Sequence, residues 1–240
     1  MKAMVLAAGR GVRLRPLTDT CPKPLLPLGG RPLLEHAIVL LARHGFDEVA
    51  VNLCHLPEMI RSYFGDGSRW GVHLTYSVET ELQGTAGALR PLRTFFDQPF
   101  LVYYADNLTN MDLGEFWSAH RREGELASIG LHREDDPCRS GILRLDPRGR
   151  VVEFIEKPRP GQVFPGYQIN CGIYALEPGI FAWIPTQGAW DFGADLFPRM
   201  LAAGQPLYGH PLQGHLLASD TPERYAAAQA AIAAGRFTLP

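Results

Sequence analysis

A short apolar segment and the irregular loop after it constrain the fold more than any other part of the chain. Residues 3–7 are small and apolar, as expected for a strand buried on both faces of a parallel sheet. Residues 9–31 contain four prolines that keep a helix from beginning before about residue 32: Pro16, Pro22, Pro24 and Pro27. The sequence therefore predicts a strand that opens into a long loop at its carboxyl end, where α/β proteins bind ligands.

This loop concentrates positive charge. It holds five basic residues and one acid, Asp19, although the whole chain carries a net charge of −2. The basic residues are Arg10, Arg13, Arg15, Lys23 and Arg31. Together with the amides of its glycines, they favour an anionic ligand. The alternative is a surface loop with scattered arginines and no ligand.

Two common phosphate-binding loops do not fit the pattern. The dinucleotide-binding fingerprint needs a third glycine where this chain has Leu14. A Walker A loop needs Gly-Lys-Ser or Gly-Lys-Thr, and the sequence contains neither. The loop is therefore expected to wrap its ligand in a different way.

Alternating strand and helix patterns follow as far as residue 104. Helices are expected at residues 32–45, 59–64 and 85–96, with strands at 49–53, 72–78 and 100–104. Beyond Asp112, which suits a helix N-cap, strands are expected at 127–131, 141–145, 151–155 and 169–176, then a helix at 192–203, a strand at 206–217 and a helix at 221–234. These patterns predict a three-layer, Rossmann-like α/β fold with a mostly parallel central sheet and a small β excursion.

Composition narrows the class of protein. A chain of 240 residues with 46% hydrophobic content is expected to form one large α/β domain. Its near-neutral charge disfavours nucleic-acid binding, and no apolar run or signal-peptide pattern predicts a membrane partner. The four cysteines are far apart and form no CxxC pair, which favours a cytoplasmic protein with reduced thiols and no zinc site.

Several segments in order give the chain a recognisable signature. They are residues 6–14 with 22–24, then 81–88, 104–107, 140–142, 156–158, 170–174 and 221–223. This set resembles the sugar-1-phosphate nucleotidyltransferases, also called NDP-sugar pyrophosphorylases, over nearly the whole chain. Within that family it is most similar to short bacterial mannose- or heptose-1-phosphate guanylyltransferases.

The resemblance implies attack of a sugar 1-phosphate on the α-phosphorus of a nucleoside triphosphate. It implies a single domain, 1–240, with a nucleotide-binding half at 1–110 and a sugar-phosphate-binding half at 111–240. Arg13 and Lys23 are the implied catalytic residues, acting on the triphosphate. The implied nucleotide-binding residues are Leu6, Ala7, Ala8, Gly9, Gly11, Gln83, Gly84 and Thr85. A plain helix start is the alternative at residues 81–87.

A second group of residues is implied to bind the sugar phosphate. They are Asn107, Gly141, Glu156, Lys157 and Asn170. Only three of the 23 basic residues are lysines. In a chain that otherwise uses arginine, the lysine next to Glu156 indicates a place where a compact ammonium is needed. The alternative for Glu156 and Lys157 is an exposed ion pair, worth under about 1 kcal/mol.

Asp106 is the candidate metal ligand. It ends an apolar strand, and Mg²⁺ is commonly held by one or two carboxylates plus substrate phosphates. The resemblance implies Mg²⁺ as the cofactor and Asp106 as its ligand, whereas a turn-forming Asp-Asn pair is the alternative.

The chain departs from the family pattern near its end. Relatives carry Asp-x-Gly-Thr-Pro, and that aspartate helps hold the metal, but this chain has Ala218 in its place and Asp220 at the glycine. Three outcomes are open. Asp220 replaces the missing aspartate as a metal ligand, or Asp220 only caps the last helix, or Asp106 and phosphates alone hold the metal. Capping is the favoured expectation.

Three functions remain open on this pattern. The first is an active nucleotidyltransferase acting on a nucleoside triphosphate and a sugar 1-phosphate. The second is a binding homologue with impaired catalysis, and the third is a nucleotide-sugar-dependent glycosyltransferase. The pattern leaves open the base (GTP, UTP, dTTP or CTP), the sugar and the size of any homo-oligomer.

Overall fold

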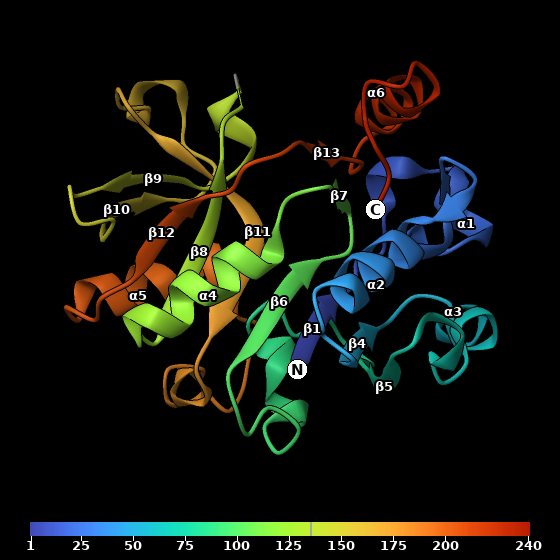
Figure 1. Cartoon of the computed structure of the whole chain (residues 1–240), viewed down its shortest axis with the longest axis horizontal. Coiled ribbons are helices and arrows are strands. Elements are labelled where there is room, and N and C mark those ends of the chain that lie inside the picture. The colour runs from blue at the N-terminus through green and yellow to red at the C-terminus, as the bar shows by residue number, and fades with distance from the viewer. Residues whose placement is uncertain (135) are drawn as a thin grey trace. The chain divides into compact units, whose positions relative to one another are not determined.

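The computed structural model describes residues 1–134 and 136–240 of a mixed α/β protein with a central, mostly parallel sheet and helices (Figure 1). This confirms the expected fold class. The described chain divides into two compact units. The first comprises residues 1–82, 103–113 and 214–240, and the second comprises 83–102 and 114–213.

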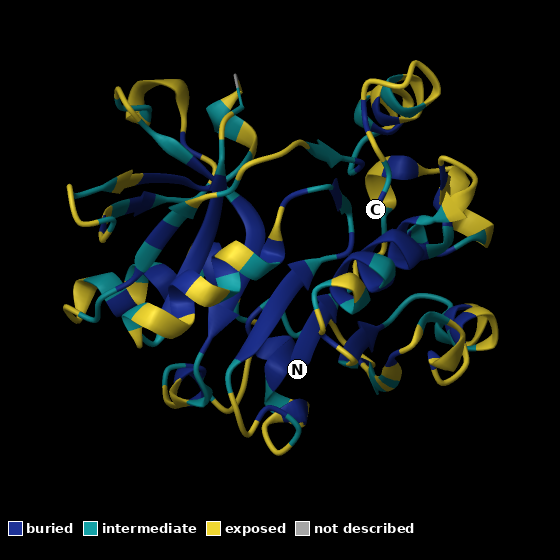
Figure 2. Cartoon of the chain, in the orientation of Figure 1, coloured by how far each residue is buried: buried dark blue, intermediate teal, exposed yellow. Residues whose placement is uncertain are grey.

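Parallel strands form the centre of the first unit. β1 (Lys2–Leu6) pairs in parallel with β4 (Glu48–Leu53), which pairs in parallel with β5 (His73–Val78). Crossovers join these strands through α2 (Leu33–Arg43) and α3 (Pro57–Phe64). The middle residues of β1 are fully buried, as predicted for a strand covered on both faces (Figure 2).

The long loop after β1 contains more regular structure than expected. Short 3₁₀ turns cover Val12–Leu14 and Lys23–Leu25, α1 is a single turn at Leu17–Thr20, and β2 (Pro27–Leu28) pairs with β3 (Arg31–Pro32). The expectation that no helical turn begins before residue 32 was wrong. Proline is tolerated at the start of a helical turn, where its missing N–H is not needed.

The end of the chain completes the first unit. β7 (Asn107–Thr109) pairs antiparallel with β13 (Leu216–Ala218), and α6 (Pro222–Ala233) follows. An apolar cluster joins the loop to α6, and the Tyr225 hydroxyl donates a hydrogen bond to the carbonyl of Pro27. The buried members of this cluster are Leu14, Leu26, Leu28, Leu33, Leu108, Tyr225, Ala228 and Phe237. The loop is therefore anchored at several points.

Mostly antiparallel strands form the second unit. β11 (Gln168–Leu176) pairs antiparallel with β8 (Ala127–His132) and β9 (Ile142–Leu145), and β9 pairs with β10 (Val151–Ile155). β12 (Tyr208–Pro211) runs parallel to β8. The helices of the second unit are α4 (Leu113–Glu123) and α5 (Phe197–Ala202). β6 (Phe100–Tyr104) has residues in both units.

Three expected elements differ in the structure. The helix expected at 85–96 is a 3₁₀ segment, Gly87–Leu92, because Pro91 inside it cannot donate a helical hydrogen bond. The helix expected at 192–203 begins with a π turn, Phe192–Leu196, before α5. The strand expected at 206–217 is two short strands, β12 and β13. In the described part of the chain, no helix has the length and apolarity needed to cross a membrane.

Candidate active site

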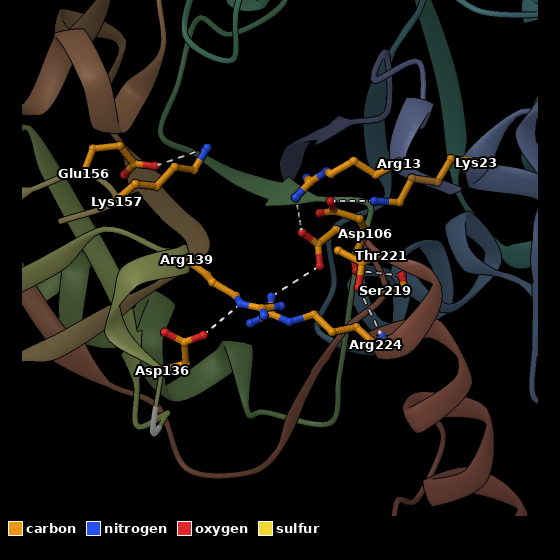
Figure 3. A network of polar contacts seen from close by, with 11 residues as sticks. Arg13, Lys23, Asp106, Asp136, Arg139, Glu156, Lys157, Ser219, Thr221 and Arg224 are labelled. Carbon is orange, nitrogen blue, oxygen red and sulfur yellow. Dashed lines mark hydrogen bonds and ion pairs between the residues drawn. The ribbon is translucent and has the colours of Figure 1, made fainter. Parts of the chain in front are cut away.

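Lys23 and Asp106 form an ion pair in the first unit (Figure 3). The Lys23 ammonium donates to Oδ2 of Asp106 at 2.8 Å, and the lysine side chain is only 12% exposed. Burial raises the pKa of the Asp106 carboxyl, but Lys23 and, more weakly, Arg13 outweigh it, so that this pKa lies below its ordinary value. Asp106 is therefore held as an anion. The two prolines beside Lys23 restrict its backbone.

Arg13 contacts Asp220 in the same unit. Its Nη1 lies 2.8 Å from Oδ2 of Asp220, while Nη1 of Arg224 lies 3.3 Å from Oδ1. The expectation that Asp220 caps the last helix is wrong. The cap of α6 is Thr221, whose side chain accepts from the Arg224 amide, since its extended backbone directs the hydroxyl back at the first turn.

Ala218 is the position at which the family resemblance implies a second carboxylate. Its Cα is paired with that of Asn107 in the β13–β7 ladder, directly beside Asp106. The next residue, Ser219, is buried and donates both its amide and its hydroxyl to the Asp106 carbonyl, at 3.1 and 3.0 Å. This segment is therefore bonded to the Asp106 backbone, and its residue at 218 has no carboxylate.

The Asp106 carboxylate is an oxygen donor of the kind that Mg²⁺ prefers. Among residues 1–134 and 136–240, no group of three or more His, Cys, Asp or Glu side chains is arranged to hold a metal. Mg²⁺ is often bound by a single carboxylate together with substrate phosphates and water. The Asp106 carboxylate fits that kind of site.

The residues after β1 separate into structural and open positions. Gly11 has a left-handed φ of 63°, and a Cβ there would lie 2.9 Å from Cγ2 of Thr18, so glycine is required by the loop itself. A Cβ at Gly9 would meet nothing within 4 Å. Gly9 therefore leaves open space next to the end of β1.

A buried polar chain supports the end of β1. The Ala7 amide donates to Oδ1 of Asn52 at 2.8 Å, and Nδ2 of Asn52 donates to Oε1 of Glu79 at 2.7 Å. Asn52 and Glu79 are both buried. Sequence reasoning missed this pair, although a polar residue inside the apolar strand β4 was a usable signal.

A pocket of about 490 Å³ lies at the carboxyl ends of β4 and β5 in the first unit. Its lining combines two arginines from the loop with a buried carboxylate. The lining residues are Arg10, Arg15, Cys54, His55, Val78, Glu79 and Thr80. A pocket with charges of both signs suits a polar ligand that has donors as well as acceptors.

Gln83, Gly84 and Thr85 belong to the second unit and are bonded to residues 190–192 there. The Trp190 amide donates to the Gln83 carbonyl at 2.8 Å, and Thr85 donates its amide and hydroxyl to Oδ1 of Asp191 at 2.9 and 3.0 Å. A Cβ at Gly84 would lie 2.4 Å from the Trp190 carbonyl oxygen. Glycine at 84 is therefore required by this close backbone packing.

Glu156 is enclosed by two glycines in the second unit. Cβ atoms built at Gly141 and Gly193 would lie 2.7 and 2.3 Å from its Oε2. Sequence reasoning found Gly141 but missed Gly193, which lies far away along the chain. Burial raises the pKa of the Glu156 carboxyl; Lys157 lowers it and Asp191 raises it, and the result lies above the ordinary value.

Lys157 combines exposure with an unusual backbone. Its side chain is 69% exposed, with Nζ 4.0 Å from Oε1 of Glu156 (Figure 3). Its φ of 46° is left-handed, which costs a non-glycine residue on the order of 1 kcal/mol or more. Such strain is often found at functional sites.

Asn170 and Asn107 take part in hydrogen bonds within their own units. The Asn170 side chain donates to the Tyr174 hydroxyl at 2.8 Å and accepts from the Gly172 amide at 2.9 Å. Its backbone amide donates to the Gly141 carbonyl at 2.9 Å, which brings these two predicted residues together. The Asn107 carbonyl accepts from the Tyr103 hydroxyl.

The chain is similar to known proteins over most of its length. Residues 2–218 match the family model described as "Nucleotidyl transferase". A UTP–glucose-1-phosphate uridylyltransferase from Synechocystis is 39% identical over 87% of this chain and 57% of its own length. A mannose-1-phosphate guanylyltransferase from Mycobacterium tuberculosis is 32% identical over 99% of this chain and 66% of its own.

A solved structure has the same fold as this chain. The putative glucose-1-phosphate thymidylyltransferase from Bacillus anthracis superposes with a TM-score of 0.86 at 26% identity, covering 96% of this chain and 94% of that one. The chain spans less than two thirds of the length of the curated relatives it matches.

Proposed function

The chain belongs to the nucleotidyl transferase family, and we propose that it transfers a nucleotidyl group from a nucleoside triphosphate to a sugar 1-phosphate. The finer proposal is guanylyl transfer to mannose 1-phosphate or heptose 1-phosphate. The observation that carries the proposed nucleotidyl transfer is the Lys23–Asp106 pair together with Arg13, since both basic residues lie in the loop after β1 and all three belong to one unit.

The proposed reaction needs little covalent chemistry from the protein. A phosphate oxygen of the sugar phosphate attacks the α-phosphorus, the bond from that phosphorus to the bridging oxygen breaks, and pyrophosphate leaves with the electron pair. Such transfer depends on positioning two anions and neutralising the charge that develops. Arg13 and Lys23 supply that positive charge, and Leu6, Ala7, Ala8, Gly9 and Gly11 are the proposed nucleotide contacts at the end of β1, where the Ala7 amide itself donates to Asn52.

Asp106 is the proposed ligand of Mg²⁺. Its lowered pKa keeps the carboxylate ionised, as metal binding requires. The bound ion would neutralise charge on the triphosphate and orient it.

The second unit is proposed to bind the sugar phosphate. Glu156 accepts hydrogen bonds from sugar hydroxyls and Lys157 contacts the phosphate, while Gly141 leaves room for the carboxylate. Asn107 and Asn170 complete the proposed contacts. The expected division into a nucleotide half, residues 1–110, and a sugar-phosphate half, residues 111–240, stays a prediction, because residues 83–102 belong to the second unit and Asn107 and residues 214–240 to the first.

Guanine is the proposed base. Glu79 lines the pocket in the first unit, and a carboxylate accepts from the adjacent N1–H and N2–H₂ groups of guanine, whereas uracil and thymine offer one ring N–H. Gln83, Gly84 and Thr85 are the remaining proposed nucleotide contacts. The guanylyltransferases among the relatives support this choice, and the uridylyltransferase makes UTP the competing substrate.

Pyrophosphate release tests the proposal. Purified protein with Mg²⁺ is assayed with GTP, UTP, dTTP and CTP, each against mannose, heptose and glucose 1-phosphates. Release that depends on both substrates, fastest with GTP, is expected. No release with any pair rejects transferase activity, and sugar transfer from an NDP-sugar would identify a glycosyltransferase instead.

A binding homologue with weak catalysis is the second candidate, favoured by Ala218, which has no carboxylate and pairs with Asn107, the neighbour of Asp106. Ala218→Asp restores a carboxylate at that position. A large gain in turnover together with tighter Mg²⁺ binding, measured by calorimetry, would support an incomplete metal site. Unchanged affinity for Mg²⁺ would reject it.

The cellular compartment, the partners and the oligomeric state of the protein are also proposed. The reaction is proposed to take place in the cytoplasm on small molecules, without a nucleic-acid or membrane partner. A homo-oligomer is expected from the resemblance, and light scattering on the purified protein measures its size.

A further inference from the structure

Asp220 bridges two arginines in the first unit. Its Oδ2 lies 2.8 Å from Nη1 of Arg13, and its Oδ1 lies 3.3 Å from Nη1 of Arg224. The side chain of Asp220 is 17% exposed, whereas that of Arg13 is 65% exposed. In this pair the carboxylate is the enclosed partner and the arginine is the open one.

The backbone on both sides of Asp220 is fixed. Ser219 before it is buried and donates two hydrogen bonds to the Asp106 carbonyl. Thr221 after it caps α6, and Arg224 lies in the first turn of that helix. Asp220 is therefore an acceptor held at a set place relative to Asp106.

Arg13, in contrast, lies on a turn of three residues, Val12–Leu14, of which only Leu14 is buried. Holding a free arginine side chain in one geometry costs up to about 2 kcal/mol of rotamer entropy. A fixed carboxylate reduces this loss before the substrate arrives. The Asp220 carboxylate contacts Nη1 of Arg13. A guanidinium has three nitrogens and five N–H donors, so this contact uses only part of them.

We propose that Asp220 is a positioning residue that orients the Arg13 guanidinium for the triphosphate, an inference that rests on the proposed function. The negative charge of Asp220 opposes binding of the anionic triphosphate. Orientation of the Arg13 guanidinium is the favourable effect that offsets this repulsion. The two effects separate in kinetics. Loss of the charge alone does not weaken binding of the nucleotide, whereas loss of orientation slows the chemical step.

A double-mutant cycle tests this with wild type, Asp220→Asn, Arg13→Ala and the double variant. Asp220→Asn is expected to lower kcat about tenfold in the wild-type background, since misplacing a catalytic group by about 1 Å costs up to about 100-fold. KM for the nucleotide is expected to stay the same or fall. In the Arg13→Ala background the same change is expected to have no effect on kcat.

Asp19→Asn is the matched control, because Asp19 pairs with Arg15 at 3.1 Å in the same loop. It is expected to leave kcat unchanged. The proposal is overturned if Asp220→Asn slows both backgrounds equally, if it leaves kcat unchanged, or if its effect is matched by the control.

Failure of the proposed function gives a different result. If wild type releases no pyrophosphate with any substrate pair, the transferase is rejected, and the same four proteins are compared by calorimetric affinity for GTP. Coupling of more than about threefold between positions 13 and 220 then keeps Asp220 as a positioning residue for an anion site. Independent effects overturn it.

Discussion

Two carboxylates that end strands, Asp106 after β6 and Glu156 after β10, differ in electrostatic surroundings. Asp106 has a buried lysine at 2.8 Å, and its pKa lies below the ordinary value of 3.8. Glu156 has an exposed lysine at 4.0 Å and Asp191 nearby, and its pKa lies above 4.5. Burial acts on both carboxyls in the same direction, so the close, shielded cation at Asp106 makes the difference.

This contrast matches two different tasks. A carboxylate held as an anion suits metal binding, for which it must be deprotonated. A carboxyl with a raised pKa, in a space left by two glycines, suits hydrogen bonds with neutral sugar hydroxyls. The expected outcomes below, from the largest effect to the smallest, test the two surroundings separately.

Arg13→Ala is expected to have the largest effect. Losing one charged donor at the site of developing charge costs on the order of 3 kcal/mol in the barrier, or about 100-fold in kcat. Pyrophosphate release measures it, with Arg31→Ala as the control from the same loop, because Arg31 pairs with Glu35 and does not line the pocket. Turnover at the wild-type rate would remove Arg13 from the mechanism.

Gly193→Ala tests the space around Glu156. The added Cβ would lie 2.3 Å from Oε2, so the carboxylate must move. KM for the sugar 1-phosphate is expected to rise about tenfold, the size of one lost charged hydrogen bond of about 1.5 kcal/mol, with KM for the nucleotide unchanged. Gly161→Ala is the control, because a Cβ there meets nothing within 4 Å.

Removing each lysine compares the two ion pairs directly. Lys23→Met is expected to raise the pKa of Asp106 strongly, because the buried ammonium lowers it. Lys157→Met is expected to raise the already high pKa of Glu156 by less, because water screens the exposed ammonium. Carboxyl carbon chemical shifts followed against pH by NMR measure both. A larger shift at Glu156 would reverse the comparison.

Stability against pH gives the two carboxyls opposite signs. A lowered folded pKa at Asp106 contributes stability above pH 3.8 that is lost as the pH falls through the folded value. A raised folded pKa at Glu156 contributes stability at low pH that is lost as the pH rises from 4.5 through the folded value. The free energy of unfolding, measured in urea at pH 3–7, should lose one of these two pH dependences in Asp106→Asn and the other in Glu156→Gln.

Thr221→Ala is expected to have the smallest effect. Loss of a threonine N-cap lowers the free energy of unfolding by about 1 kcal/mol. Urea unfolding measures it, and Asp220→Ala is the comparison for the cap that was wrongly expected there. No loss from Thr221→Ala would contradict the capping role of Thr221, whereas a loss from Asp220→Ala reports its ion pairs with Arg13 and Arg224.

Local patterns predicted a large part of this molecule. The apolar run of β1, the proline-rich loop and the helix after Pro32 follow from residues close together in sequence, and the family resemblance is confirmed. The expected helix at 85–96 was wrong because Pro91 outweighed the apolar periodicity. The roles of the predicted site residues stay predictions, although the structure pairs Lys23 with Asp106 and places Gly141 against Glu156.

Sequence alone determined the order of strands and helices, the basic loop and the candidate charged groups, because each depends on neighbours along the chain. Tertiary structure decided which charges meet. Asp220 pairs with Arg13 across more than 200 residues, Gly193 opens space for Glu156, and Asn52 joins Ala7 to Glu79. These contacts depend on distances between side chains set by packing of the whole fold, and no local pattern in a sequence encodes them.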